Sequence, residues 1–168
     1  MTSWLSAIYA SVALWFAVAI GNVALFTLQP PDHWPVLETI EALQSASMIP
    51  IALILHRINY SSRLSAVITV IGLVGMVLGV VIDIAFVSEL LSYGKGLAAV
   101  LGFTIAIILS LLWLFAANLL AWRGRTLPKN VALLGMAAAI TGTLLYPIWA
   151  IRLAGVIRAS DPRRTRSH

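Results

Sequence analysis

Several apolar segments of this chain are longer than the roughly 18 residues that mark a candidate membrane span. Short polar or basic segments separate them, and only 10% of the 168 residues are charged. A soluble domain carries about 25% charged residues. Within lipid, a segment must satisfy its own backbone hydrogen bonds, as a helix does. The sequence therefore predicts an all-α fold, a polytopic transmembrane helical bundle with no room for a soluble domain beside it.

Five apolar segments predict five spans in a single transmembrane domain, residues 1–157. Residues 158–168 are rich in arginine, and we expect them to form a basic, disordered tail. Three prolines within residues 29–35 predict a surface loop, because proline cannot continue a helix. The expected spans lie at about residues 4–26, 38–55, 64–86, 97–122 and 131–151.

The third segment carries a carboxylate inside an apolar run. In a helix, its small residues and this carboxylate share one face, because they are three or four residues apart: Gly72, Gly75, Gly79 and Asp83. Small residues let a neighbouring helix approach closely, and Gly75 and Gly79 form a GxxxG pair. A carboxylate within a span must face the protein interior or a wet cavity and find a partner there. The face is therefore either a packing seam, with Asp83 only capping or pairing, or part of a site.

Basic residues predict the orientation of the bundle, but those in the loops and those at the end of the chain predict opposite orientations. In a five-span arrangement the amino terminus shares one side with the basic loops 57–63 and 123–129. The positive-inside rule makes that side cytoplasmic, and we expect a cytoplasmic amino terminus because every internal loop agrees. The end of the chain disagrees, because five spans place its basic residues on the opposite side: Arg152, Arg158, Arg163, Arg164 and Arg166.

The same arrangement brings every acid of the chain towards one side. Buried charges need opposite charges or hydrogen bonds. Arg152 is the one cation within a span on that side, so we expect it to pair with Asp83 or with Glu38 and Glu41. The predicted ligand-binding residues are Asn22, Glu38, Glu41, Asp83, Tyr146, Trp149 and Arg152.

Purely structural interpretations of these residues remain open. Glu38 can be solvated at the mouth of its helix, where a carboxylate suits the positive end of the helix dipole. Arg152 can extend to lipid headgroups. Tyr146 and Trp149 can be aromatic anchors at the membrane interface.

Three functions are compatible with this pattern. The leading hypothesis is a small membrane protein that binds an amphiphilic or lipid-like molecule in a polar pocket of one leaflet. The second is an intramembrane isomerase, cyclase or hydrolase that uses Glu41 and Asp83 as acid and base on a lipophilic substrate. The third is a non-catalytic assembly subunit or homo-oligomer, held together through Gly72, Gly75 and Gly79.

Other chemistries are disfavoured. The absence of cysteine excludes disulfides, thiolate catalysis and cysteine-based metal sites. His33 and His56 lie at opposite ends of the second span, too far apart to share a metal, and we expect neither a metal nor a cofactor. The basic loops lack the fold context of a nucleic-acid binder, so the expected partners are membrane lipids.

The last third of the chain contains three short motifs, at Leu127–Lys129, Leu133–Gly135 and Leu145–Ala150. With these motifs the chain resembles a loosely defined group of uncharacterised bacterial multi-pass membrane proteins. The resemblance implies a helical bundle in a bacterial cytoplasmic membrane. It carries no catalytic residue over to this chain.

Overall fold

The fold is helical throughout the described part of the chain. The computed structural model describes residues 2–28, 35–59, 62–88, 97–142 and 144–160, and these contain helices and no strand. Most of the predicted proline-rich loop and of the predicted tail lies outside these residues. The helices are α1 (Thr2–Leu28), α2 (Pro35–Ile58), α3 (Arg63–Val87), α4 (Leu97–Arg123), α5 (Lys129–Ile140) and α6 (Tyr146–Ala159).

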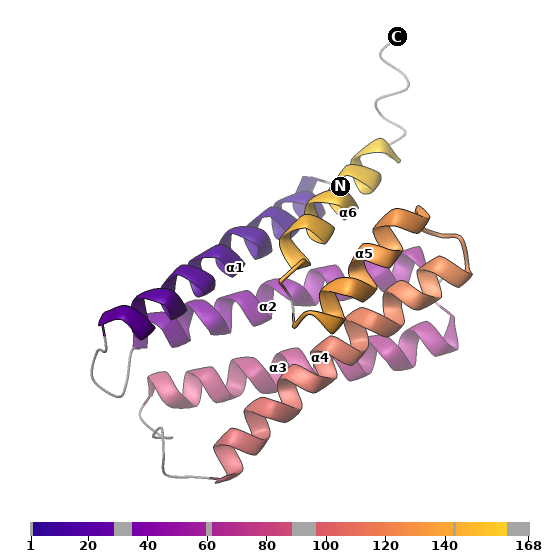
Figure 1. The fold of residues 1–168 in the computed structure, drawn as a ribbon. Helices are drawn as coiled ribbons and strands as arrows, with labels where there is room; N and C mark the ends of the chain where they lie inside the picture. Colours follow the sequence, from indigo (N-terminus) through magenta and orange to yellow (C-terminus); the bar gives the residue numbers. More distant parts are fainter. Residues whose placement is uncertain (1, 29–34, 60–61, 89–96, 143, 161–168) are drawn as a thin grey trace.

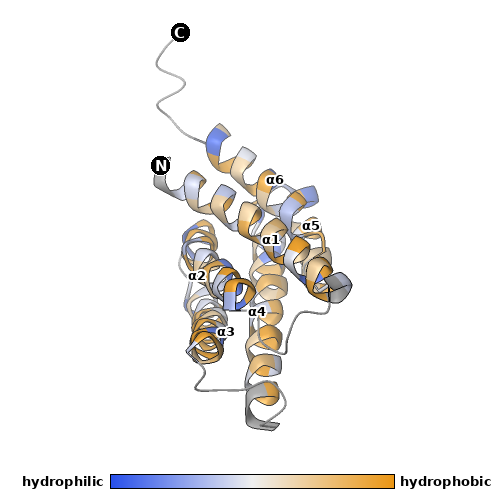
Figure 2. Cartoon of the chain, turned by 90° about the vertical axis from the view of Figure 1, so that its left-hand side faces the viewer, coloured by the Kyte–Doolittle hydropathy of each residue, from blue (hydrophilic) through white to orange (hydrophobic). Residues whose placement is uncertain are grey.

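Four helices, α1 to α4, are long and apolar enough to cross a membrane. At 1.5 Å per residue, a helix of 24 residues is about 36 Å long, more than the roughly 30 Å of a bilayer core. Figure 2 shows the apolar colouring along most of the length of α4. The predicted all-helical bundle is therefore confirmed for the described residues, with four helices that are candidate membrane spans.

The exposed surface of α3 is typical of a helix that faces lipid. Its buried face holds small and polar residues, among them Ser65, Thr69, Gly75 and Asp83. Its exposed face is a stripe of β-branched apolar residues, each at least 50% exposed: Val67, Val70, Val74, Val77, Val81 and Ile84. A helix of a soluble protein has the opposite arrangement, with its apolar stripe turned inward.

Local signals account for the helix ends. Helix α2 begins at Pro35 with Glu38 in its first turn and ends with His56 and Arg57, so both ends complement the helix dipole. At the start of α3, the Ser62 hydroxyl accepts a hydrogen bond from the Ser65 backbone N–H at 3.1 Å. This bond satisfies one of the free N–H groups that every helix has at its beginning.

The fifth predicted span is not a single helix. Residues 131–151 are divided between α5, of 12 residues, and α6, of 14 residues. Gly142 ends α5 with a positive φ of 61°, a conformation that glycine adopts without the strain of a side chain. Pro147 then stands in the first turn of α6, where its missing N–H leaves no intrahelical bond unmade. Each helix alone is shorter than the roughly 20 residues that cross a bilayer.

Helices α5 and α6 form a hairpin beside the four long helices (Figure 1). The long helices pack in chain order, α1 on α2, α2 on α3 and α3 on α4. Among the described residues, α1 and α4 make no backbone contact with each other; instead α5 packs on α4, α6 on α1, and α5 on α6. The hairpin therefore fills part of the space between α1 and α4.

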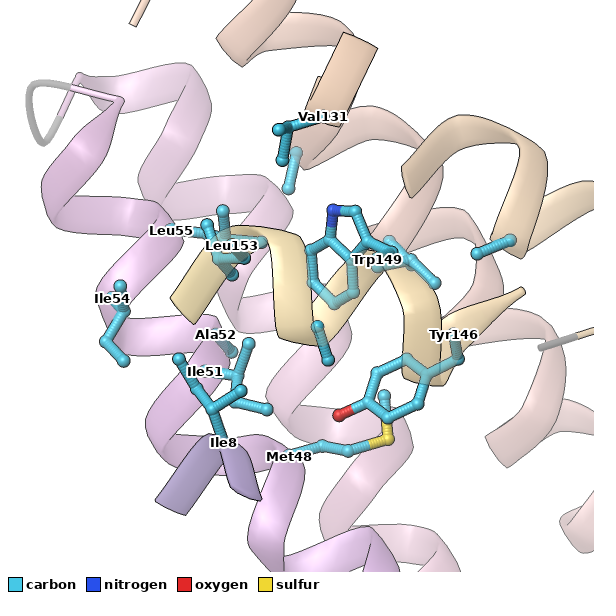
Figure 3. Close-up of a cluster of buried hydrophobic side chains, with 14 of the residues drawn as sticks. Ile8, Met48, Ile51, Ala52, Ile54, Leu55, Val131, Tyr146, Trp149 and Leu153 are labelled. Atoms are coloured by element: carbon cyan, nitrogen blue, oxygen red, sulfur yellow. The ribbon is translucent and has the colours of Figure 1, made fainter. Parts of the chain in front are cut away.

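The core lies where this hairpin meets the long helices (Figure 3). Tyr146 and Trp149 of α6 are fully buried, and so are Trp113 and Leu114 of α4. Aliphatic side chains of α1 and α2 complete the cluster, including Ile8, Ile51 and Leu55.

The glycine face of α3 packs inside the chain. A Cβ atom added to Gly72 would lie 2.3 Å from Cγ of Trp113, and one added to Gly75 would lie 2.9 Å from the backbone oxygen of Ala106. The predicted close approach of a neighbouring helix is therefore present, and that neighbour is α4 at Gly72 and Gly75, whereas Gly79 faces Ser45 of α2. A homo-oligomer through these glycines stays a prediction, and it would require α4 to leave this face.

Candidate functional site

A cavity of about 250 Å³ opens into the bundle between the four long helices. Helices α2 and α3 provide its polar lining, with Glu41, Ser45 and Asp83. Helix α4 adds apolar residues and Ser110, and Val18 of α1 stands at the other side. The cavity is only partly enclosed, and Phe103 and Ile107 on its α4 wall are themselves 38% and 43% exposed.

The short hairpin explains why this cavity exists. Helices α5 and α6 occupy the space between α1 and α4 over only part of its length, because α5 ends at Ile140 and α6, which begins at Tyr146, runs back in the opposite direction. Gly142, in that turn, lines the cavity. Beyond the turn no described helix lies between α1 and α4, and the space is left to the side chains around the cavity.

Asp83 is buried without a protein partner. Its side chain is only 3% exposed, and it lines the cavity. No hydrogen bond or ion pair to its carboxyl group is formed by the described residues. Transfer of a charged or polar group from water to the interior is costly unless a partner compensates it. The carboxyl group of Asp83 is therefore available to a molecule in the cavity.

Glu41 faces the same cavity from α2. Its Oε1 atom lies 3.4 Å from Nδ2 of Asn22, which also donates to the backbone oxygen of Val18 at 3.0 Å. Asn22 thus contacts Glu41 from α1. The sequence placed Asn22 near the acids, and the structure brings the two residues together.

Glu38 lies one turn before Glu41 and is 2% exposed. It does not line the cavity, but its charge acts on both Glu41 and Asp83. Three carboxyl groups from two helices are therefore concentrated at one place, and no Lys, Arg or His among the described residues lines the cavity. This site favours molecules that bring a positive charge or hydrogen-bond donors.

Arg152 is not among these groups. It is exposed on α6, and α6 packs on α1 and α5 rather than on α3. The expected pairing of Arg152 with Asp83 followed from a continuous fifth span, which would have carried Arg152 to the acidic end. The reversal at Gly142 takes α6 in the opposite direction.

Tyr146 and Trp149 lie in the core rather than on a cavity wall. The Tyr146 and Ser11 hydroxyl groups are hydrogen-bonded at 2.5 Å, which joins α6 to α1. Trp149 donates its Nε1–H to Oδ1 of Asn118 on α4 at 3.0 Å, and Asn118 donates to the backbone oxygen of Leu114 at 2.8 Å. These two polar links hold the hairpin against the helices on either side of it.

Tyr146→Phe should weaken this attachment without changing the cavity. We expect the free energy of unfolding to fall by about 0.6 kcal/mol, and by at most about 1.7 kcal/mol, the range measured for hydrogen bonds between membrane helices. Unfolding in mild detergent, combined with Ser11→Ala in a double-mutant cycle, isolates the bond. Additive effects of the two changes would contradict a direct hydrogen bond.

Sequence reasoning missed the roles of Ser11, Asn118 and Gly135. A Cβ atom at Gly135 of α5 would lie 2.2 Å from Cγ of Asn118, so the glycine makes room for the amide. An asparagine in an otherwise apolar span was the available signal, because such a residue must find partners within the bundle. The sequence did not show which helix would supply them.

The described residues contain no group of three or more His, Asp or Glu side chains arranged to hold a metal ion. Glu38, Glu41 and Asp83 are near one another, yet they do not converge as ligands. The site is therefore a set of acidic anchors in a partly apolar cavity. No protein-family model, curated protein or solved structure matches this chain, so the family resemblance of its last third stays a prediction.

Proposed function

We propose that this integral membrane protein binds a lipid-like amphiphile whose headgroup carries an amine or several hydrogen-bond donors. The observation that carries the proposal is the unpartnered, 3% exposed carboxyl group of Asp83 in a cavity that Glu41 also lines. An ammonium or hydroxyl headgroup supplies to Asp83 the hydrogen-bond donor that the described protein groups do not. The remaining walls, including Phe103 and Ile107, accept an alkyl chain.

The position and size of the cavity support a single-chain ligand. Its volume of about 250 Å³ is below the roughly 300–1,000 Å³ of typical small-molecule sites. Helices α1 and α4 stand apart on either side of it. A hydrophobic chain can therefore enter sideways from the lipid while its headgroup reaches the acids.

The proposal predicts a preference for positive headgroups. A fluorescent long-chain alkylamine should bind the purified protein at least about tenfold more tightly than the fatty acid of the same chain length, because one charge-assisted hydrogen bond contributes about 1.5–3 kcal/mol. Asp83→Asn should remove most of this difference, and Glu41→Gln part of it. Fluorescence titration in detergent micelles measures each Kd.

Arg152→Gln is the matched control, because it also replaces one charged group with a polar amide, but outside the cavity. It should leave the preference unchanged. Equal binding of amine and acid, or equal binding by wild type and Asp83→Asn, would refute the proposal. Mass spectrometry of the gently purified wild type then tests whether a specific amphiphile co-purifies and is lost in Asp83→Asn.

An intramembrane acid–base enzyme is the second candidate, because Glu41 and Asp83 line one cavity from two adjacent helices. Two neighbouring carboxyl groups can divide the roles of acid and base. If the co-purifying molecule is converted, the rate should follow a bell-shaped pH profile. Loss of the acidic or the basic limb of this pH profile in Glu41→Gln or Asp83→Asn would show that the protein catalyses a reaction rather than only binding the molecule.

A further inference from the structure

We propose that α5 and α6 enter and leave the membrane on one side, so that the described part of the chain crosses it four times and the start of α1 and the end of α6 share the cytoplasmic side. The basic residues at that end then form a surface for anionic lipid headgroups. The basic surface lies at the end of the bundle opposite the acids Glu38, Glu41 and Asp83, whatever the cavity binds.

The contacts of the hairpin fix its direction. Gly135 is six residues after the start of α5, and it faces Asn118, which is five residues before the end of α4. Helices α4 and α5 are therefore antiparallel, and they pack on each other beginning at the turn that joins them. Tyr146, at the start of α6, is bonded to Ser11. Ser11 is nine residues into α1, about 14 Å from its beginning at 1.5 Å per residue.

The hairpin therefore turns near the middle of the bundle and goes back. From Tyr146, α6 runs along α1 towards the beginning of that helix, and both views place the outer end of α6 beside the start of α1 (Figures 1 and 2). At 14 residues, α6 is about 21 Å long, enough to return from mid-membrane to the surface. Non-helical backbone at such a depth is tolerated where it lines a cavity, as Gly142 does.

The helix ends on this side are joined to one another. Asn59, after α2, donates to the backbone oxygen of Ala117 on α4 at 3.1 Å and accepts from the Thr126 hydroxyl at 3.2 Å. The guanidinium carbon of Arg57 lies 5.3 Å from the centre of the Trp4 ring, near the start of α1. The start of α1, the ends of α2 and α4 and the end of α6 therefore meet at one end of the bundle.

With the hairpin in this position, the acidic and the basic residues lie at opposite ends of the bundle. The described acids, Glu38, Glu41 and Asp83, lie in the halves of α2 and α3 away from this end. Arg152 is exposed on α6 and long enough to extend its guanidinium towards the same surface as the other cations. The described basic residues at or next to this end are Arg57, Arg63, Arg123, Arg125, Lys129 and Arg158.

This arrangement removes the conflict found in the sequence. Five spans placed the basic loops and the arginine-rich end of the chain on opposite sides. Four spans and a one-sided hairpin place them together, and the positive-inside rule then applies to all of them at once. Each basic residue near an anionic cytoplasmic leaflet contributes about 1 kcal/mol of attraction.

Cysteine labelling tests the topology directly, because the natural chain contains no cysteine. Single variants Asn130→Cys, Ser88→Cys and Ser160→Cys are treated with a membrane-impermeant maleimide in right-side-out and inverted vesicles. All three positions are exposed. We expect residues 130 and 160 to be labelled at least about tenfold more in inverted vesicles, and residue 88 in right-side-out vesicles.

Each labelling outcome decides a part of the proposal. Labelling of residue 160 together with residue 88 would restore a fifth crossing and overturn the hairpin. Labelling of residues 130 and 160 together from the outer side would keep the hairpin but overturn the cytoplasmic assignment. A protein fused at both ends to a cytoplasm-dependent fluorescent reporter gives the same distinction without vesicles, with signal expected from both ends.

The lipid surface has its own test. Phosphatidylglycerol should raise the Tm of the purified protein more than phosphatidylcholine with the same acyl chains. The variant Arg123→Gln/Arg125→Gln/Lys129→Gln should lose this difference, while Glu38→Gln, at the other end, should keep it. An equal response of wild type to both lipids would overturn the headgroup surface.

Discussion

Gly135→Ala should lower the free energy of unfolding by about 2–6 kcal/mol, the sum of overpacking and of a disturbed buried amide, each of which costs about 1–3 kcal/mol. The new methyl group would lie 2.2–2.4 Å from the side-chain atoms of Asn118, which is fully buried. Asn118 cannot move away without losing its bond from Trp149. Thermal or chemical unfolding in mild detergent measures the loss.

Gly155→Ala is the matched control for this change. Gly155 lies on α6 of the same hairpin, and a Cβ atom there would have no neighbour within 4 Å. Alanine favours a helix over glycine by about 1 kcal/mol, so the control should be neutral or slightly stabilising. A similar loss of stability in both variants would show that the contact between Gly135 and Asn118 is not what holds the hairpin.

Gly72→Ala should cost about 1–3 kcal/mol by overpacking. Its methyl group would overlap with Trp113, which is fully buried and has its Cβ atom, close to the backbone of α4, only 2.7 Å away. The tryptophan cannot rotate out of the way, so α3 and α4 must separate. The midpoint of unfolding and the protease resistance of the helix pair report this change.

Gly79→Ala on the same helix provides the comparison. Its Cβ atom would lie 3.3 Å from Oγ of Ser45, a contact that a small movement of the serine relieves. We expect a loss below about 1 kcal/mol, because no buried ring has to move. A loss below about 1 kcal/mol at Gly72 as well would mean that the glycine face tolerates side chains generally, contrary to the close contact of Gly72 with Trp113.

The four long helices could be read from the sequence almost to their ends. Apolar length identifies a span, and a basic or polar turn marks where it stops, so residues 64–86 were expected where α3 runs from Arg63 to Val87. The shared face of Gly72 to Asp83 was also predictable, because helical spacing alone determines it. The neighbouring helix that covers this face was not predictable from spacing.

The structure of the last part of the chain was harder to predict from the sequence, for a physical reason. Residues 131–151 have the apolar content of a span, but hydropathy does not record a change of direction. Gly142 and Pro147 are both compatible with a transmembrane helix when neighbours satisfy the backbone. In this chain the direction of the helix reverses between Gly142 and Pro147. A continuous span would have placed Arg152, Tyr146 and Trp149 near the acids, and in the structure none of the three lines the cavity.

The hydrogen bond between Ser11 and Tyr146 joins residues 135 positions apart, and this has a consequence for biogenesis. Helices α1 to α4 can each partition into lipid as soon as they leave the ribosome, because each is apolar enough by itself. The hairpin is too short for that and needs α1 and α4 already in place to receive Tyr146 and Trp149. The hairpin therefore closes the bundle only after α1 to α4 are in place, and a nascent chain interrupted before Lys129 would keep an unfilled groove that membrane proteases can recognise.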